Sequence, residues 1–307
     1  MAHTARPFRV RAPIAVWAVA AVGLAVIGVW AQVILPSMFE IPGRGDGVGF
    51  SLISDQLFSI AGVPVTNTLL SCWLAMLLIV SLFLTARVLA SYGHLGLLTA
   101  IEVPFETFWR FVQGLVGPKI ATPLFTIAGS AVLFILANAW IASLPFYGPV
   151  YWTASDGTSV PLLRGAGSDI NMSLALALSA GILVQFFGVY SLGLAYVERF
   201  FRVRLLLKGR MIAGSAEFLA GIFELFLEMI RVLSFTFRLF GSLTAGEVLI
   251  LAIGFIAPLA VVVPFYGLEL LIGAVQAWIF GSLFAVFAAA AIGFESRDDD
   301  TPAGAIQ

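Results

Sequence analysis

Five long apolar runs constrain the fold of this chain more than any other feature of its sequence. They cover residues 13–36, 66–89, 123–144, 172–197 and 211–294. A helix of about 20 apolar residues crosses the hydrocarbon core of a bilayer, which is about 30 Å thick. The composition agrees, because 61% of the 307 residues are hydrophobic and 11% are charged, whereas soluble domains contain about 25% charged residues. The sequence therefore predicts an all-α polytopic membrane protein.

The last run, residues 211–294, is too long for one crossing and contains Pro258 and Pro264. We predict a helical hairpin that turns near these prolines, with arms of roughly 35 to 45 residues, or about 50–65 Å. A hydrocarbon core of about 30 Å cannot hold such arms upright. The arms must tilt steeply, kink or run partly outside the membrane. With the four earlier runs, the hairpin brings the total to about six transmembrane helices.

Residues 13–36 fit either a signal peptide or a retained first span, because three arginines precede them. The apolar core of a signal peptide has about 7–15 residues, whereas this run has about 23 and no clear small-residue cleavage site. We therefore favour a retained span. Residues 1–65 then form an N-terminal extra span and external loop, and residues 66–307 form the core.

Basic residues in the connections predict the orientation of the chain. Three arginines and no acid precede the first run, and residues 198–210 carry four arginines and one lysine against one glutamate. Cytoplasmic loops are rich in Lys and Arg, whereas the alternate connections, 36–65 and 146–171, are poor in both. Both termini, including the acidic tail 295–307, are thus expected in the cytoplasm. We favour a bacterial plasma membrane over an organelle as the location.

Residues 96–117 combine aromatic side chains with charges at helical spacing. Glu102, Glu106 and Arg110 recur every four residues and leave an aromatic face. This pattern predicts a helix that lies in the cytoplasmic interface. A simple amphipathic loop fits nearly as well.

Several kinds of site are not supported by the sequence. Cys72 is the only cysteine, and the two histidines, His3 and His94, cannot form a zinc site without other ligands. The glycine-rich residues 43–49 lack the Lys-Ser/Thr ending of a P-loop. No long basic stripe indicates nucleic-acid binding. We expect no metal, no cofactor and no nucleic-acid partner.

Ionisable residues inside the predicted hairpin are the candidates for function. Each costs at least about 2.5–3.5 kcal/mol at the centre of a membrane helix, so such residues are functional candidates by default. The polar residues of the hairpin are Glu217, Glu224, Glu228, Arg231, Arg238, Glu247, Glu269 and Gln276. Glu217 and Glu228 carry less weight because they fall close to a membrane interface.

Helical spacing sorts these residues into faces. Glu224, Arg231 and Arg238 recur every seven residues, which drifts only about 20° per step. Ser242 lies five whole turns beyond Glu224 and shares this face. Glu247 falls about 140° away from Glu224. The first arm therefore carries one polar stripe and a separate acid.

A second stripe, Glu269 and Gln276, lies on the returning arm. Two antiparallel arms would bring the stripes together around Arg238. Arginine keeps its proton in a protein, so Arg238 is a permanent positive charge. Carboxyl groups gain or lose a proton according to their solvation, so Glu224, Glu247 and Glu269 can relay protons. A fixed cation between such acids suits a mechanism that acts on a carboxylate of a partner.

Structural explanations of these residues remain open at this point. Arg238 could pair with a glutamate simply to hold the hairpin together. Glu224 or Glu269 could be a hydrogen-bonding residue between helices, and Gln276 alone fits helix packing better than a relay.

Three motifs resemble a known family. Residues 234–247 carry Arg-Leu-Phe-Gly-Ser and then Ala-Gly-Glu, and they closely resemble the arginine motif, Arg-Leu-Phe-Gly-Asn with Ala-Gly-Glu, of subunit a of the rotary F-type ATP synthase. Residues 275–280 resemble its last-helix motif, Gln-Ala-aromatic-Ile-Phe. Residues 169–174 resemble its Asp-x-Asn-x-Thr-Leu segment, and Asn138 fits the span before it. The resemblance covers about residues 66–294.

The resemblance implies a stator proton-channel subunit whose tilted hairpin packs against a ring of c subunits, the c-ring. By position, Arg238 would be the essential arginine that faces the ring carboxylates, and Gln276 would lie opposite it. Glu247 and Glu269 would line a half-channel from the external side, and Glu224 would line one to the cytoplasm. The implied partners are the c-ring, the peripheral stalk subunit b, the remaining ATP synthase subunits and the lipid bilayer. The chain alone is expected to catalyse nothing.

The chain departs from the family pattern at two positions. Ser242 replaces the usual Asn, and Glu269 stands where some members carry His. Asp169, Asn171 and Arg231 are further candidates of lower weight, together with Ser242. The sequence does not fix whether the coupling ion is H⁺ or Na⁺, because the selective site would lie on the ring.

Two other classes of protein are alternatives. A self-contained secondary transporter or channel usually shows internal repeats and broken helices in corresponding halves, whereas the first four runs are almost free of mid-span charge. A structural membrane scaffold would leave the arginine and glutamates of the hairpin unexplained.

Overall fold

The computed structural model describes residues 54–60, 63–91, 95–144, 151–153, 159–193, 196, 200, 211–256 and 259–293. The predicted first span at 13–36, the basic segment 198–210 except residue 200, and the tail 295–307 lie outside the described residues.

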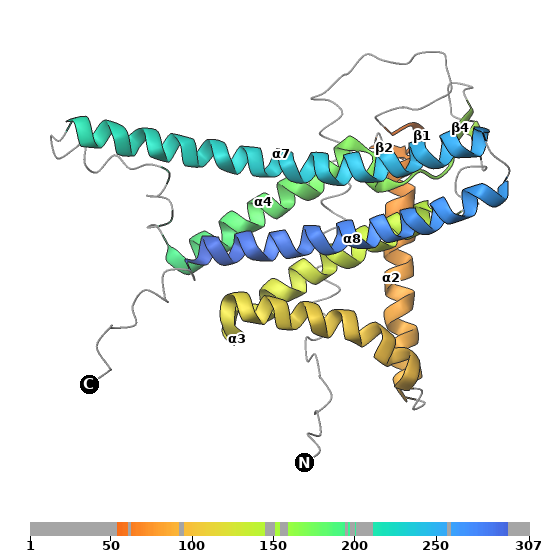
Figure 1. Ribbon diagram of the computed structural model, residues 1–307, viewed down its shortest axis with the longest axis horizontal. Coiled ribbons are helices and arrows are strands. Elements are labelled where there is room, and N and C mark those ends of the chain that lie inside the picture. Colours follow the sequence, from red (N-terminus) through yellow and green to blue (C-terminus); the bar gives the residue numbers. More distant parts are fainter. Residues whose placement is uncertain are drawn as a thin grey trace.

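Long helices dominate the described part of the chain, which confirms the all-α polytopic fold class (Figure 1). The elements, in chain order, are β1 (Gln56–Ile60), β2 (Val63–Thr66), α2 (Asn67–Ser91), α3 (Leu95–Ala142), β3 (Tyr151–Thr153), β4 (Ser159–Pro161), the 3₁₀ turn η1 (Ala166–Ser168), α4 (Ile170–Leu192), α7 (Met211–Ile256) and α8 (Leu259–Ile292). The four short strands pair as two antiparallel hairpins, β1–β2 and β3–β4. The sequence patterns do not predict these hairpins.

Among the described residues, four helical segments are long and apolar enough to cross a membrane. They are Asn67–Val88, Ile120–Ala142, Ile170–Leu192 and Val261–Ile292. Gly193, with φ of 62°, ends α4, so this helix stops before residue 197, the predicted end of the span. The long helix α7 is not one of the four, although it pairs with α8 along the hairpin.

The two arms of the hairpin differ in length. Helix α7 has 46 residues and α8 has 34, and at 1.5 Å per residue α7 is about 69 Å long. Helix α7 ends at Ile256 and α8 begins at Leu259, and Pro264 lies inside α8. Both arms run across the direction of α2 instead of along it (Figure 1). If α2 crosses the bilayer upright, both arms must therefore tilt steeply.

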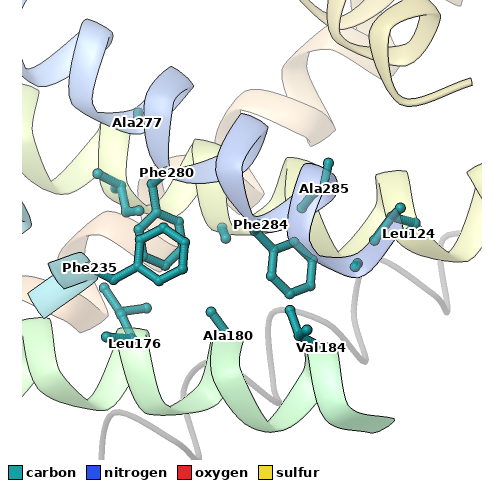
Figure 2. Close-up of a cluster of buried hydrophobic side chains, with 14 of the residues drawn as sticks. Leu124, Leu176, Ala180, Val184, Phe235, Ala277, Phe280, Phe284 and Ala285 are labelled. Atoms are coloured by element: carbon teal, nitrogen blue, oxygen red, sulfur yellow. The ribbon is translucent and has the colours of Figure 1, made fainter. Parts of the chain in front are cut away.

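The core of the molecule lies where α8 packs against α3, α4 and α7. Figure 2 shows Phe235 of α7 beside Phe280 of α8; their rings are tilted relative to each other, and the ring centroids are 5.1 Å apart. Leu176 and Ala180 of α4 point toward these rings from the other side. All four side chains are buried. This aromatic contact fixes how the two arms of the hairpin meet.

Helix α8 also packs closely on α3, where small residues let the two backbones approach. A Cβ atom at Gly281 would overlap Val132 and would lie 3.2 Å from Cζ of Phe108. A Cβ atom at Gly273 would lie 2.6 Å from that of Ala139. Both contacts leave no room for a side chain at these glycines.

The first half of α3 contains the predicted amphipathic helix at residues 96–117. It is helical, and Arg110 donates to Glu106 at 2.6 Å across one turn. Gly117, with φ of 71°, interrupts the helix before the apolar part that begins at Ile120. The helical alternative is therefore confirmed over the loop, and its place at the membrane interface stays a prediction.

Candidate functional site

The register of α7 and α8 places the two polar stripes at matching heights. Phe235 contacts Phe280, and a Cβ atom at Gly246 would lie 3.2 Å from Cγ of Glu269. Phe235 and Gly246 are eleven positions apart along α7. Their partners on α8, Phe280 and Glu269, are also eleven positions apart, in the opposite direction, as expected for antiparallel helices. Residue 238 therefore matches residue 277, which puts Gln276 at the level of Arg238, the place that the family resemblance implies for it.

Arg238 and Gln276 each keep a buried polar atom without a partner. Nη1 of Arg238 and Oε1 of Gln276 form no hydrogen bond within the described part of the chain. Arg238 makes no ion pair with any described residue, and its guanidinium lies 5.8 Å from the ring centre of Phe235. The alternative in which Arg238 locks the hairpin by pairing with a glutamate is therefore not what the structure shows. Buried polar atoms of this kind need a partner, which the described chain does not supply.

Glu247 and Glu269 come together near the end of α7. Glu269 is 6% exposed and packs against Gly246, and its carboxyl interacts electrostatically with that of Glu247. Glu247 faces η1, where Ser168 donates a hydrogen bond of 2.7 Å to Oε1. Two carboxyl groups from antiparallel helices thus share one buried region. They lie about 13 Å along α7 from Arg238, nine residues at 1.5 Å each.

Asp169 and Asn171 lie beside this region but have structural contacts of their own. Asp169 is fully buried, and its carboxylate accepts hydrogen bonds from the backbone N–H of Asn171 at 3.0 Å and from the hydroxyl of Thr68 at 3.1 Å. Asp169 therefore caps the first turn of α4 and ties α4 to α2. Burial raises the pKa of the Asp169 carboxyl above its usual range. Nδ2 of Asn171 is buried without a hydrogen-bond partner among the described residues.

The other members of the stripe on α7 have different surroundings. Arg231 donates to Glu228 at 2.6 and 2.7 Å and stacks over the ring of Phe287 at 4.1 Å. The hydroxyl of Ser242 donates to the carbonyl of Arg238 at 2.8 Å, and so it bonds to its own helix. Arg231 and Arg238 are seven residues, or two turns, apart and share one face of α7. Only the charge of Arg231 is matched by a neighbouring acid.

Sequence reasoning missed the turn that holds Glu247. Ser168 contacts Glu247 directly, and a Cβ atom at Gly165 would lie 2.5 Å from its Oε1. Arg164 interacts electrostatically with Glu247 and donates to the carbonyl of Ser168 at 3.4 Å. No helical periodicity identifies residues in a connection. The one signal is the run of small residues, 165–168, directly before the cap of α4.

The comparison with protein families agrees with this geometry. A family model described as ATP synthase A chain matches residues 69–289. The chain belongs to the ATP synthase A chain family. ATP synthase subunit a of Mycobacterium bovis is 29% identical over 237 residues, which cover 76% of this chain and 89% of that protein. The same subunit of Gloeobacter violaceus is 28% identical, with 76% and 85% covered, and ATP synthase subunit a 2 of a Bradyrhizobium species is 29% identical, with 79% and 96% covered.

Membership of the ATP synthase A chain family confirms the resemblance found in the sequence motifs. The match spans α2, α3, α4, α7 and nearly all of α8. It associates the chain with ATP synthesis and proton transport in a membrane, and not with a self-contained transporter or a scaffold. The matched residues begin after β2, so the N-terminal 68 residues lie outside the shared region.

Proposed function

We propose that this chain is the stator of a proton-driven rotary motor, in which two offset half-channels meet a c-ring along α7 and α8. A proton enters from the external side past Glu247 and Glu269 and neutralises a carboxylate of the ring. The neutral site can turn through lipid, where a charged one would be too costly. After nearly a full turn, the site releases its proton toward the cytoplasm near Glu224. Arg238 stabilises the ionised carboxylate and blocks a direct proton path between the half-channels.

The observation that carries the proposal is the unmatched charge of Arg238. Its Nη1 is buried and has no hydrogen-bond partner among the described residues, whereas Arg231, two turns earlier on the same face, is paired with Glu228. Arg238 as a whole is half-buried, and a guanidinium partly removed from water is stabilised by an anion. A carboxylate carried by a second protein fits this need, and a partner whose carboxylates arrive in succession fits the motor.

The location and partners complete the proposal. We place the chain in a bacterial plasma membrane with both termini in the cytoplasm, and the c-ring and the peripheral stalk subunit b as its neighbours. Exposed apolar side chains along α7, such as Phe223, Phe226 and Phe237, offer a surface for the ring. The catalytic sites for ATP lie on other subunits, so this chain conducts protons and catalyses no reaction itself.

Replacing single acids tests the two half-channels. Glu247→Gln and Glu224→Gln each keep the side-chain shape but remove the group that binds and releases a proton, so we expect each to slow passive proton flux roughly tenfold or more. The measurement is made on membranes that contain the assembly without its catalytic head. Glu102→Gln is the matched control, because Glu102 is exposed on α3 and its loss should leave the flux unchanged. Normal flux in Glu247→Gln or Glu224→Gln would remove that residue from the path.

A further inference from the structure

The hydroxyl of Ser168 has two acceptors within reach. Its oxygen lies 2.7 Å from Oε1 of Glu247 and 2.8 Å from the carbonyl oxygen of Gly165, and the side chain is buried. A hydroxyl carries one proton and two acceptor lone pairs. Ser168 can therefore donate to only one of the two oxygens at a time. Which of the two oxygens accepts the hydrogen bond from Ser168 depends on whether Glu247 is ionised or protonated.

Both protonation states of Glu247 find a matching arrangement. When Glu247 is ionised, Ser168 donates to its carboxylate. When Glu247 is protonated, its own O–H can donate to the hydroxyl oxygen of Ser168, and Ser168 turns to donate to the carbonyl of Gly165. The proton of Ser168 stays on its oxygen throughout and only rotates about the Cβ–Oγ bond. No buried polar atom of the pair loses its partner in either state.

The turn that carries Ser168 is built to hold this contact. Gly165 leaves the space that Oε1 of Glu247 fills, and a Cβ atom at Gly167 would overlap Leu243, one turn before Glu247 on α7. The hydroxyl of Ser173 donates to the carbonyl of Gly167 at 2.9 Å and fixes the turn from behind. The fixed distance between Ser168 and Glu247 thus has a structural cause on both sides.

We propose that Ser168 is a positioning residue of the external half-channel, whose hydroxyl turns between Glu247 and Gly165 as Glu247 gains and loses a proton. The proposal rests on the proposed role of Glu247 in the proton path. Its charged neighbours are Glu269, from α8, and Arg164, which precedes η1. Asp169 follows Ser168 but bonds to Thr68 and Asn171. By serving both states of Glu247, Ser168 keeps proton transfer there reversible.

Ser168→Ala tests the proposal through the pH profile of passive proton flux. The ionised state of Glu247 loses a charge-assisted hydrogen bond and the protonated state loses a weaker neutral one. Glu247 should therefore stay protonated to higher pH, and we expect the profile to shift upward by roughly one pH unit, with flux at neutral pH reduced roughly tenfold. Ser168→Cys, with a weaker donor of similar volume, should shift it in the same direction by less.

Ser173→Ala is the matched control. It removes a buried hydroxyl that holds the same turn but does not touch a carboxylate. A purely structural effect on flux would therefore appear in both variants. A shifted pH profile should appear only in Ser168→Ala. Equal profiles in the two variants would overturn the proposal, and so would an unshifted Ser168→Cys if Ser168→Ala fails to assemble. In the Glu247→Gln background, Ser168→Ala should cause no further shift. If Glu247→Gln conducts protons at the normal rate, the half-channel assignment of Glu247 fails. If Glu247→Gln blocks the flux but Ser168→Ala leaves the pH profile unchanged, only the role of Ser168 is refuted.

Discussion

Arg238→Ala should abolish ATP-driven proton pumping in membranes that hold the whole assembly. The substitution removes the one guanidinium of the α7 face that lacks an acid beside it, so the carboxylate of the partner would lose its counter-charge and the two half-channels would lose the barrier between them. We expect pumping per ATP hydrolysed to fall by about 100-fold or more, which corresponds to about 3 kcal/mol for an unpaired buried charge. Proton uptake by inverted vesicles, with ATP hydrolysis followed in the same sample, measures this ratio.

The matched control is Arg231→Ala. Arg231 lies on the same face of the same helix, but its charge already meets Glu228 and its side chain stacks on Phe287. We expect this variant to lower the amount of assembled protein while pumping per assembled complex remains. Coupled pumping at the normal rate in Arg238→Ala would refute the stator-arginine role, and equal losses in both variants would show that the position of Arg238 has no special importance.

Gly281→Val should prevent α3 and α8 from packing and should strongly reduce the amount of assembled protein. Cγ2 of Val132 already fills the space at Gly281 and Phe108 lies close by, so a valine there requires Val132 to shift or the two helices to separate. Overpacking of this kind costs about 1–3 kcal/mol in protein cores, and here the contact also sets the position of the arm that carries Gln276. The measurement is the level of assembled protein in membranes, together with its thermal unfolding in detergent.

Gly267→Val is the control for this packing prediction. Gly267 lies on the same helix, but a Cβ atom there meets no atom of the described residues within 4 Å, so a larger side chain has open space at this position. We expect near-normal assembly of Gly267→Val and poor assembly of Gly281→Val. Similar assembly of the two variants would contradict the tight contact between α3 and α8.

The hairpin and its two polar stripes are predictable because they depend on helical repetition. A spacing of seven residues puts Arg238 on one stripe and Gln276 on another, and antiparallel pairing of the two arms lets the stripes face each other. The separate face of Glu247 followed from the same arithmetic, and the structure adds what that face contacts. Gln276 opposite Arg238 is what the family resemblance implies, whereas the apolar runs and the helical period alone predict only two facing stripes.

The turn at residues 165–168 was not predictable by this route. Its residues belong to a connection, where no period relates one side chain to the next, and their contacts join positions about 80 apart in the chain. The two short β-hairpins escaped prediction for the same reason. Arg231 and Glu228 have an i, i+3 spacing that is compatible with an ion pair, but the spacing alone does not show that Glu228 lies buried enough to matter.

The length and direction of α7 have a consequence for distance. Glu224 and Glu247 are 23 residues apart, or about 35 Å along the helix axis. Helix α7 runs across α2 (Figure 1). If α2 stands upright in the bilayer, most of this separation therefore lies parallel to the membrane plane, and little of it lies along the membrane normal. No side chain spans such an offset, so in the proposed path a proton that moves between the two acids must be carried sideways by another group. The tilt of α7 therefore makes lateral movement of the proton carrier, and not depth in the membrane, the main distance that the proposed path has to cover.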